Sequence, residues 1–382
     1  MSLIKLSYSE YENEPKYWEI SDATFTNINL IVGKNSSGKS RLMSVISSFA
    51  KLLSGNQPIP FEACKFSANL NLDGGEFYYE IEFKEGAVSN EVLQVNGHVK
   101  LTRGNDGYGE IRYEQQNATI PFKLPPDAVA AVNRRDEIQH PFLIELHQWA
   151  NSVILFHFGK DFGQSKLIGL NDAMAFLNNS NPALFDDPNN LIRVYTSAFT
   201  LFNEGFDKAV INDMKTLGYS LKDVGSVDLR EIMNFPTAAL AMFAVESDLD
   251  FKNPQMYMSQ GMYRALAIVI NLNASAFSKS KQLILIDDIG EGLDYERAVA
   301  IIDLIINKAK ANDMQVIMTS NDRFVMNEVP LEYWSVLKRK SGIVKMFNLR
   351  NSQKQFDEFK YLGLNNFDFF ASDFFEPEVV ND

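Results

Sequence analysis

Near residue 33 the spacing of apolar residues along the chain changes from a continuous run to a helical repeat. The run at 28–32 is typical of a buried strand. From residue 42 onward, apolar residues recur at intervals of three and four up to Ser54-Gly55, where a helix can end. These residues are Leu42, Val45, Ile46, Phe49, Leu52 and Leu53. The pattern predicts a strand, a tight turn and a helix in direct succession.

A period of two replaces the helical spacing beyond this helix. Apolar and polar residues alternate in short runs separated by turn signals, as expected of an antiparallel meander. The predicted strands are 66–72, 77–83, 92–95, 99–101 and 108–113, with turns at Asp73-Gly74-Gly75 and Asn96-Gly97. A meander directly after the first helix is unusual for a simple doubly wound fold.

The second half of the chain is predicted to contain helices, two strands and a final hairpin. From about 161 to 252 the pattern is helical and irregular, and apolar strands return at 283–286 and 316–318. Residues 333–337 and 344–349 predict the hairpin.

The segment 351–382 is rich in phenylalanine and acidic residues. Its phenylalanines are Phe356, Phe359, Phe367, Phe369, Phe370, Phe374 and Phe375. So many aromatic rings are too costly to leave in water. We expect this tail to dock on the body of its own chain, with a partner protein as the alternative.

Composition limits the class of protein. The chain of 382 residues, 46% of them hydrophobic, has room for two or three compact units with a sizeable core. The single cysteine, Cys64, excludes a disulfide framework, and the first residues lack the pattern of a secretory signal. No apolar run approaches the ~18 residues of a membrane helix. We therefore expect a cytoplasmic protein without a membrane partner.

The formal net charge of −13 opposes indiscriminate binding of nucleic acid, which depends on Lys and Arg residues that neutralise phosphates. Nucleic acid stays open as a partner, because a local basic groove needs only a few such residues. The densest basic run is Lys338-Arg339-Lys340, followed by Ser341-Gly342. We interpret this run as a solvated hairpin tip.

The turn between the first predicted strand and helix fits the phosphate-loop pattern G-x-x-x-x-G-K-[ST]. It reads Gly33-Lys34-Asn35-Ser36-Ser37-Gly38-Lys39-Ser40. A strand, a glycine-rich turn and a helix start direct backbone N–H groups at one point, which suits a polyphosphate such as that of ATP. Lys39 is predicted to reach the β- and γ-phosphates, and the Ser40 hydroxyl to bind Mg²⁺. The alternative is an ordinary glycine-rich turn that caps a helix.

A second motif follows the predicted strand at 283–286 and consists of two acidic residues, Asp287 and Asp288. Asp287 is predicted to hold Mg²⁺ through water, and Asp288 to orient or deprotonate the attacking water. The alternative is a buried strand that ends in a helix-capping aspartate.

Two further segments carry a resemblance to a known family. The run from Asp287 to Asp294 resembles the D-E-P-x-x-x-L-D run of ABC-type ATPases, and the run from Met258 to Arg264 resembles their L-S-G-G-Q-x-x-R signature. Together with the phosphate loop and the acid pair, four segments stand in the family's order. The chain resembles ABC-type ATPases of the SMC and DNA-repair kind. Within that group it is most similar to bacterial ATPases related to overcoming-lysogenisation-defect (OLD) and phage-defence proteins.

The resemblance implies an α/β fold, namely a P-loop ABC-type head with a mixed sheet, an antiparallel meander and a helical insertion. Residues 1–158 and 256–350 would form the head, 159–255 an arm or dimer contact, and 351–382 the tail. Two heads would close around two Mg-ATP. Ser259 and Gly261 would then complete the neighbour's site, and Asp294 would lie at the seam.

The chain departs from the family at several positions. Asp288 is one methylene shorter than the usual glutamate, and Asn321 stands where a switch histidine is common, so hydrolysis by Lys39, Asp288 and Asn321 is expected to be slow. Gln94, Gln115 and Gln116 are all candidates for the Q-loop, and Tyr17 or Trp18 for adenine stacking. His98, His140, His147 and His157 show no metal-ligand spacing. We expect no Toprim nuclease domain, because only about 60 residues follow Asp322.

The resemblance favours a regulatory ATPase that works as a homodimer of heads or a higher oligomer. It would control an effector protein encoded by a neighbouring gene, for instance in phage defence. Two alternatives stay open, a DNA-bound repair-type ATPase and an ATP-stabilised scaffold in which hydrolysis is vestigial. A transporter subunit fits less well, because the insertion is long and the signature is atypical.

Overall fold

A computed structural model describes residues 1–56, 62–158, 163–177, 184–185, 190–279 and 281–376. The chain divides into two compact units. The first consists of Met1–Leu155, Gln282–Leu285 and Gln315–Asp382, and the second of Phe156–Lys281 and Ile286–Met314. The sequence-based division into head, insertion and tail is a different partition and stays a prediction. Residues 159–162, 178–183 and 186–189 of the insertion and 377–382 of the tail lie outside the described residues.

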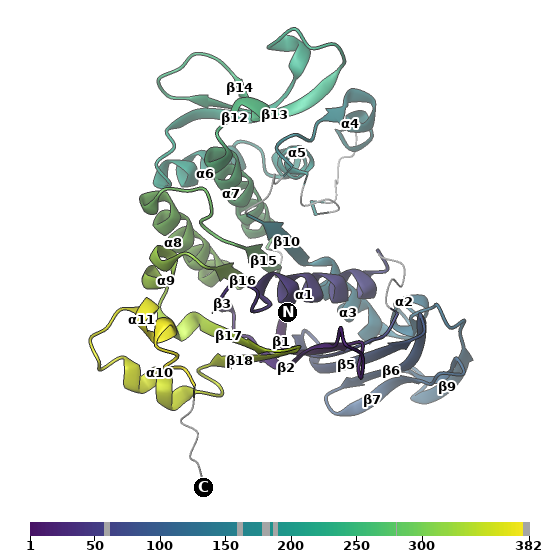
Figure 1. Cartoon of the computed structure of the whole chain (residues 1–382). Coiled ribbons are helices and arrows are strands. Elements are labelled where there is room, and N and C mark those ends of the chain that lie inside the picture. The colour runs from purple at the N-terminus through teal and green to yellow at the C-terminus, as the bar shows by residue number, and fades with distance from the viewer. Residues whose placement is uncertain (57–61, 159–162, 178–183, 186–189, 280, 377–382) are drawn as a thin grey trace. The chain divides into compact units, whose positions relative to one another are not determined.

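One mixed sheet of fourteen described strands organises the first unit (Figure 1). Its order is β10-β15-β16-β3-β17-β18-β2-β1-β4-β5-β6-β7-β8-β9. The strands are β1 (Ser2–Glu10), β2 (Trp18–Thr24), β3 (Ile28–Gly33), β4 (Cys64–Leu72), β5 (Gly75–Lys84), β6 (Ala87–Val95), β7 (His98–Arg103), β8 (Tyr108–Tyr113), β9 (Ala118–Lys123), β10 (Val153–His157), β15 (Leu283–Asp287), β16 (Gln315–Ser320), β17 (Trp334–Lys340) and β18 (Ile343–Asn348). Strands β10 and β15 begin in the first unit and end in the second.

The sheet combines a parallel part with an antiparallel part. Strand β3 pairs in parallel with both β16 and β17, and β18 pairs in parallel with β2. From β2 through β1 to β9 every pairing is antiparallel. The mixed sheet with an antiparallel meander, predicted from the sequence, is confirmed. The starts of three strands are aligned by the N–H of Gln315, which donates to the oxygen of Gln282 at 3.0 Å, and the N–H of Val316, which donates to that of Asn27 at 2.7 Å.

Helix α1 (Lys39–Ser54) shares its core with the meander and with α3 (Pro141–Asn151). The predicted apolar face of α1 is buried, and Phe49 stacks on Phe66 of β4 with ring centroids 5.4 Å apart. The ring of Trp149 on α3 lies 5.8 Å from Phe49 on another side. The short helix α2 (Ala130–Asn133) precedes α3. Burial of these large rings anchors α1, and thereby the turn before it.

The tail packs on the body of its own unit, as the sequence predicts. After α9 (Arg323–Glu328) and the β17–β18 hairpin, it forms α10 (Gln353–Phe359) and α11 (Asn366–Ala371), which Figure 1 shows beside that hairpin. Four of its phenylalanines are buried, namely Phe356, Phe359, Phe369 and Phe375. Phe369 meets Trp334 at 6.5 Å and Phe375 meets Phe347 at 5.3 Å. The basic run at 338–340 ends β17 at an exposed hairpin tip, as predicted, and Lys338 pairs with Asp373.

The second unit holds helices and a small sheet of order β11-β13-β12, with β14 paired to β13. Its elements are β11 (Ile168–Gly169), α4 (Leu170–Leu177), α5 (Leu191–Phe202), α6 (Glu204–Thr216), β12 (Leu221–Asp228), β13 (Ala239–Glu246), β14 (Asn253–Pro254), α7 (Gln260–Ser278) and α8 (Tyr295–Asn312). The sequence predicts only helical and irregular structure before α7. Strand β13 was not predicted because seven of its eight residues are buried, so its sequence lacks the alternation of apolar and polar residues that indicates a strand.

Three polar side chains tie the helices of the second unit together. Asp213 on α6 accepts from Nδ2 of Asn273 on α7 and pairs with Nζ of Lys308 on α8, both at 2.7 Å. Nζ of Lys308 also donates to Oδ1 of Asn273 at 2.7 Å. The buried carboxylate is therefore paired with a cation and hydrogen-bonded, which is the condition for keeping a charge inside a protein. Among the described helices of both units, none combines the length and apolar character needed to cross a bilayer.

Candidate functional site

The phosphate loop lies in the first unit between a fully buried strand and the start of α1. Every residue of β3 is buried, and α1 begins at Lys39 with Gly38 as its N-cap in the left-handed region at φ 105°. Ser36 is left-handed as well, at φ 64°. Nζ of Lys39 donates to the carbonyl oxygen of Gly33 at 2.8 Å. The side chain of Lys39 therefore folds back along the loop, toward the place where the strand ends.

Two glycines in this loop cannot carry a side chain. A Cβ on Gly33 would lie 2.5 Å from Oγ of Ser37 and 2.8 Å from the carbonyl oxygen of Leu337. A Cβ on Gly38 would lie 3.2 Å from the ring of Trp18, at a φ that L-residues rarely adopt. The sequence pattern thus reflects a backbone that turns sharply and lies close to its neighbours.

The loop has the features that a bound polyphosphate needs. Helix α1 has no side-chain N-cap, because its N-cap residue is a glycine, and the N-terminus of such a helix favours anions. Ser37 is 5% exposed, and its Oγ has no hydrogen-bond partner among the described residues. A buried hydroxyl without a partner is unusual unless a ligand satisfies it. The residues present therefore fit a nucleotide phosphate chain.

Trp18 packs against the loop, and its buried ring is not accessible to a nucleotide base. It is 1% exposed, and the guanidinium of Arg41 lies 4.4 Å above its ring while pairing with Glu10. Tyr17 is half-buried, and its hydroxyl donates to Glu19, which raises the pKa of Tyr17 to about 12. Of the two predicted adenine-stacking residues, only Tyr17 retains an accessible ring.

The acid pair ends β15, with its side chains in the second unit. Asp287 is 5% exposed and its carbonyl oxygen accepts from the N–H of Phe158 at 2.8 Å. Nδ1 of His157 lies 3.4 Å from Oδ2 of Asp287. Asp288 is half-buried and left-handed at φ 58°.

The sequence analysis did not predict that His157 lies beside Asp287. The sequence feature that could have indicated this position is that His157 is the last residue of the mainly apolar strand β10, as Asp287 is the last residue of the apolar strand β15.

The turn after the acid pair is held by the segment that resembles the ABC signature. Gly290 and Gly292 give it left-handed corners at φ 89° and 79°. Nη1 of Arg264, on α7, donates to the carbonyl oxygen of Glu291 at 2.8 Å. A Cβ on Gly261 would lie 3.1 Å from Leu293. The two predicted segments therefore contact each other inside the second unit.

Ser259 is exposed at the start of α7 and acts as its N-cap, where its Oγ accepts from the N–H of Met262 at 3.2 Å. Two glutamines fix the backbone just before it. Nε2 of Gln164 donates to the carbonyl oxygens of Gln255 and Met258, each at 2.8 Å. Nε2 of Gln255 donates in return to that of Gln164 at 2.8 Å. The helix start that Ser259 caps is thus held rigidly.

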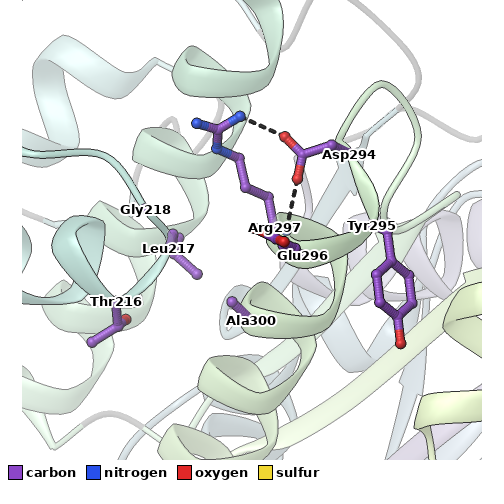
Figure 2. A pocket seen from close by; sticks show the side chains of 8 residues that line it. All are labelled: Thr216, Leu217, Gly218, Asp294, Tyr295, Glu296, Arg297 and Ala300. Atoms are coloured by element: carbon purple, nitrogen blue, oxygen red, sulfur yellow. Dashed lines mark hydrogen bonds and ion pairs between the residues drawn. The ribbon is translucent and has the colours of Figure 1, made fainter.

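Asp294 caps α8 and lines a pocket of about 540 Å³ in the second unit, together with Arg297, Tyr295 and residues 216–218 (Figure 2). Its Oδ1 accepts from the N–H of Arg297 at 3.0 Å, and its Oδ2 pairs with Nη1 of that arginine. The backbone hydrogen bond, followed by the arginine side chain, lowers the pKa of Asp294. This carboxylate is therefore held in place as an anion.

Asn321 lies in the first unit, exposed after β16, while Asp322 caps α9 by accepting from the N–H groups of Phe324 and Val325. The predicted site residues thus fall into two sets. The first unit holds the phosphate loop and Asn321, and the second holds Asp287, Asp288, Ser259, Gly261 and Asp294. Their roles stay predictions.

A strand, phosphate loop and helix at a mixed sheet define a P-loop ATPase head. The chain belongs to the family described as "AAA domain, putative AbiEii toxin, Type IV TA system", whose pattern matches residues 28–327. The chain is therefore a nucleotide-binding P-loop protein of the ATPase class. A search of curated proteins finds no match.

Three solved structures of SMC heads are similar to this chain. One is an SMC head bound to the C-terminal winged-helix domain of ScpA, with 13% identity, a TM-score of 0.52, and coverage of 91% of this chain and 97% of that one. A Pyrococcus furiosus Smc head bound to the C-terminal domain of ScpA gives 14% identity, 94% and 99% coverage, and a TM-score of 0.49. The Thermotoga maritima SMC head has 12% identity and a TM-score of 0.45, with coverage of 91% of this chain and 99% of that one. The first likeness shows that the fold is that of an ABC-type head of the SMC kind. A relationship to OLD proteins stays a prediction.

Proposed function

We propose that this protein is a regulatory ATPase that binds Mg-ATP at residues 33–40, hydrolyses it slowly and controls a partner protein. The observation that carries this proposal is the phosphate loop. Three features of the loop suit a polyphosphate: its left-handed backbone at Ser36 and Gly38, the inward side chain of Lys39, and the Oγ of Ser37, which has no hydrogen-bond partner within the described part of the chain. Membership of an ATPase family supports the same ligand.

Ser40 and Asp287 would hold the Mg²⁺ ion, which neutralises phosphate charge when bound. Lys39 would bind the β- and γ-phosphates, Asp288 would orient or deprotonate water, and Asn321 would donate to the γ-phosphate. The strand order supports this division of roles, because β3, β16 and β15 are successive neighbours in the sheet. These strands are followed by the loop, by Asn321 and by the acid pair in turn.

We propose that two heads dimerise around nucleotide, with Ser259 and Gly261 completing the partner head's site and Asp294 at the seam. The exposed N-terminus of the 19-residue helix α7 supports this role, since it favours added negative charge. Control of an effector protein is supported by two likenesses. The family description names a toxin of a toxin–antitoxin system, and the similar SMC head with a TM-score of 0.52 is bound to a domain of ScpA. A role in phage defence is the biological setting that we propose.

Calorimetric titration of ATP into Lys39→Ala and Lys51→Ala tests the assignment. Lys39 lies in the loop and is buried against Gly33, whereas Lys51 is exposed in the last turn of α1. Loss of a hydrogen bond to a charged group costs about 1.5–3 kcal/mol, so Lys39→Ala is expected to weaken ATP binding roughly 10- to 100-fold. Lys51→Ala should bind nearly as the native chain does. Unchanged affinity in Lys39→Ala would show that the loop is an ordinary helix cap.

A further inference from the structure

His157 and Asp287 form a pair at the ends of two neighbouring strands. Strand β10 ends at His157 and β15 ends at Asp287, and β10 and β15 are adjacent in the sheet. The N–H of Phe158 donates to the carbonyl oxygen of Asp287 at 2.8 Å, which fixes the two backbones side by side. Nδ1 of His157 then lies 3.4 Å from Oδ2 of Asp287, within the second unit.

The separation of these atoms leaves room for a shared metal ion between them. Charge-assisted N–H···O contacts are shorter, at about 2.7–2.9 Å. Two neighbouring ligands of an octahedral ion, with bonds of about 2.1 Å, lie about 3 Å apart. A small rotation of the imidazole converts 3.4 Å into that separation. The carboxylate side chain is 7% exposed and the imidazole 34%, so the pair opens to solvent on the histidine side.

The donor set identifies the kind of ion. No group of three or more His, Cys, Asp or Glu side chains in the described parts of the chain is arranged to hold a metal. An ion that binds only one imidazole and one carboxylate takes its other ligands from hydroxyl, phosphate and water oxygens, as is usual for nucleotide-bound Mg²⁺. An imidazole nitrogen is a ligand for first-row transition-metal ions, of which Mn²⁺ also accepts oxygen ligands, whereas Mg²⁺ prefers oxygen ligands alone.

We propose that His157 is a direct ligand, beside Asp287, of the divalent ion that accompanies the nucleotide, and that the site consequently selects Mn²⁺ over Mg²⁺. This inference rests on the proposed function, since the nucleotide supplies the remaining oxygens. It adds a nitrogen ligand to the predicted oxygen ligand Ser40, and it makes Asp287 a direct ligand, whereas the sequence predicts that Asp287 holds the ion through water.

Pulsed electron paramagnetic resonance of the full chain with Mn²⁺ and ATP tests the ligand directly. We expect a ¹⁴N coupling typical of a bound imidazole in the native chain, and its loss in His157→Gln, which replaces the ring with an amide. His98→Gln is the matched control, because His98 is exposed on β7 in the first unit. By calorimetry, His157→Gln should lower the ratio of Mn²⁺ to Mg²⁺ affinity about tenfold.

Each other outcome has a defined meaning. Nucleotide-bound Mn²⁺ without ¹⁴N coupling in the native chain overturns the inference and leaves the proposed function standing. The same is true if His157→Gln weakens the binding of both metals equally, because His157 would then act only by orienting Asp287. If the native chain does not bind ATP in the presence of either metal, the proposed function itself is overturned, and the proposed role of His157 as a ligand is overturned with it. Since the coupling is first read in the native chain, the test does not depend on the stability of the variant.

Discussion

Nη1 of Arg264 donates a hydrogen bond of 2.8 Å to the carbonyl oxygen of Glu291, and so joins the start of α7 to the turn that follows the acid pair. The arginine is 7% exposed and its guanidinium lies within 5.7 Å of the ring of Phe158, which neighbours His157. One side chain thus contacts two of the segments that flank Asp287. This contact suggests how the helix that begins at Ser259 communicates with the proposed catalytic residues.

Arg264→Met should slow ATP turnover with little effect on ATP binding. Methionine retains much of the aliphatic stem but removes the donor to Glu291, so the turn that carries Asp288 loses one of its fixed points. We expect kcat to fall about tenfold and the Kd for ATP to stay within about threefold. Arg350→Met, at an exposed arginine of the first unit, is the control. A fall in ATP affinity that matches the fall in kcat would contradict this role.

Asp288→Asn should abolish turnover while ATP binding persists. Asparagine tolerates the left-handed backbone at this position, so the turn is preserved and only the carboxylate is lost. Asp288→Glu should increase turnover, because the resemblance to ABC-type ATPases implies a glutamate at this position. Single-turnover hydrolysis measures both. If cellular function survives Asp288→Asn but not Lys39→Ala, the protein is an ATP-stabilised scaffold. Stimulation of ATP turnover by DNA would instead favour a DNA-bound repair-type ATPase.

Asp288→Asn with ATP should form a dimer that Ser259→Arg prevents. The side chain of Ser259 is exposed at the N-terminus of α7, so an arginine would fill the space that the proposed partner head needs. Ser372→Arg, in the same Asp288→Asn background, is the control, because it makes the same change at an exposed serine of the tail. Light scattering gives the particle mass. A mass that responds neither to ATP nor to Ser259→Arg would rule out the dimer.

Phe369→Ala should destabilise the first unit, because this ring is fully buried among Trp334, Phe356 and Phe359. A loss of about 3–5 kcal/mol in the free energy of unfolding is expected from urea denaturation. Tyr361→Ala is the matched control in the same tail, since Tyr361 is 89% exposed, and should change stability by less than about 0.5 kcal/mol. Equal effects of the two changes would mean that the tail is not docked in solution.

Glu91 should make the stability of the first unit depend on pH. Burial raises its pKa, while the N–H groups of Ala130 and Ala131 and the hydroxyl of Tyr79 donate to its carboxylate. The folded chain therefore binds the proton more tightly than the unfolded chain. The contribution of Glu91 is complete below the ordinary glutamate pKa, about 4.3, and is lost as pH rises through the raised value. Urea titrations of native chain and Glu91→Gln should diverge in this direction. A constant difference across that range would contradict it.

The sequence predicted the phosphate loop and the meander because both depend on contiguous residues. The run before Gly33, the helical spacing after Lys39 and the turns at Asp73-Gly74-Gly75 and Asn96-Gly97 are local signals, and the structure has β3, α1 and the strands β4–β8 there. Strand β13 gave no such signal because its residues are buried on both faces.

The proximity of His157 to Asp287 also lay beyond the sequence pattern. It arises because β10 and β15 are neighbours in the sheet although about 130 residues separate them, and strand order is a property of the whole fold. The contact of Arg264 with Glu291 is non-local for the same reason. The sequence therefore revealed which residues have the chemistry for a site, whereas the pairs that they form needed the fold.

The Mg²⁺ dependence of ATP affinity in Asp287→Asn tests most directly whether the loop and the acid pair bind one Mg-nucleotide. Calorimetry would compare the native chain, Asp287→Asn and Lys39→Ala, each with Mg²⁺ and with a chelator. We expect Mg²⁺ to strengthen ATP binding by the native chain, Asp287→Asn to retain only the metal-independent affinity, and Lys39→Ala to bind weakly in both conditions. If Mg²⁺ strengthens binding by Asp287→Asn as much as by the native chain, Asp287 does not share the nucleotide of the phosphate loop.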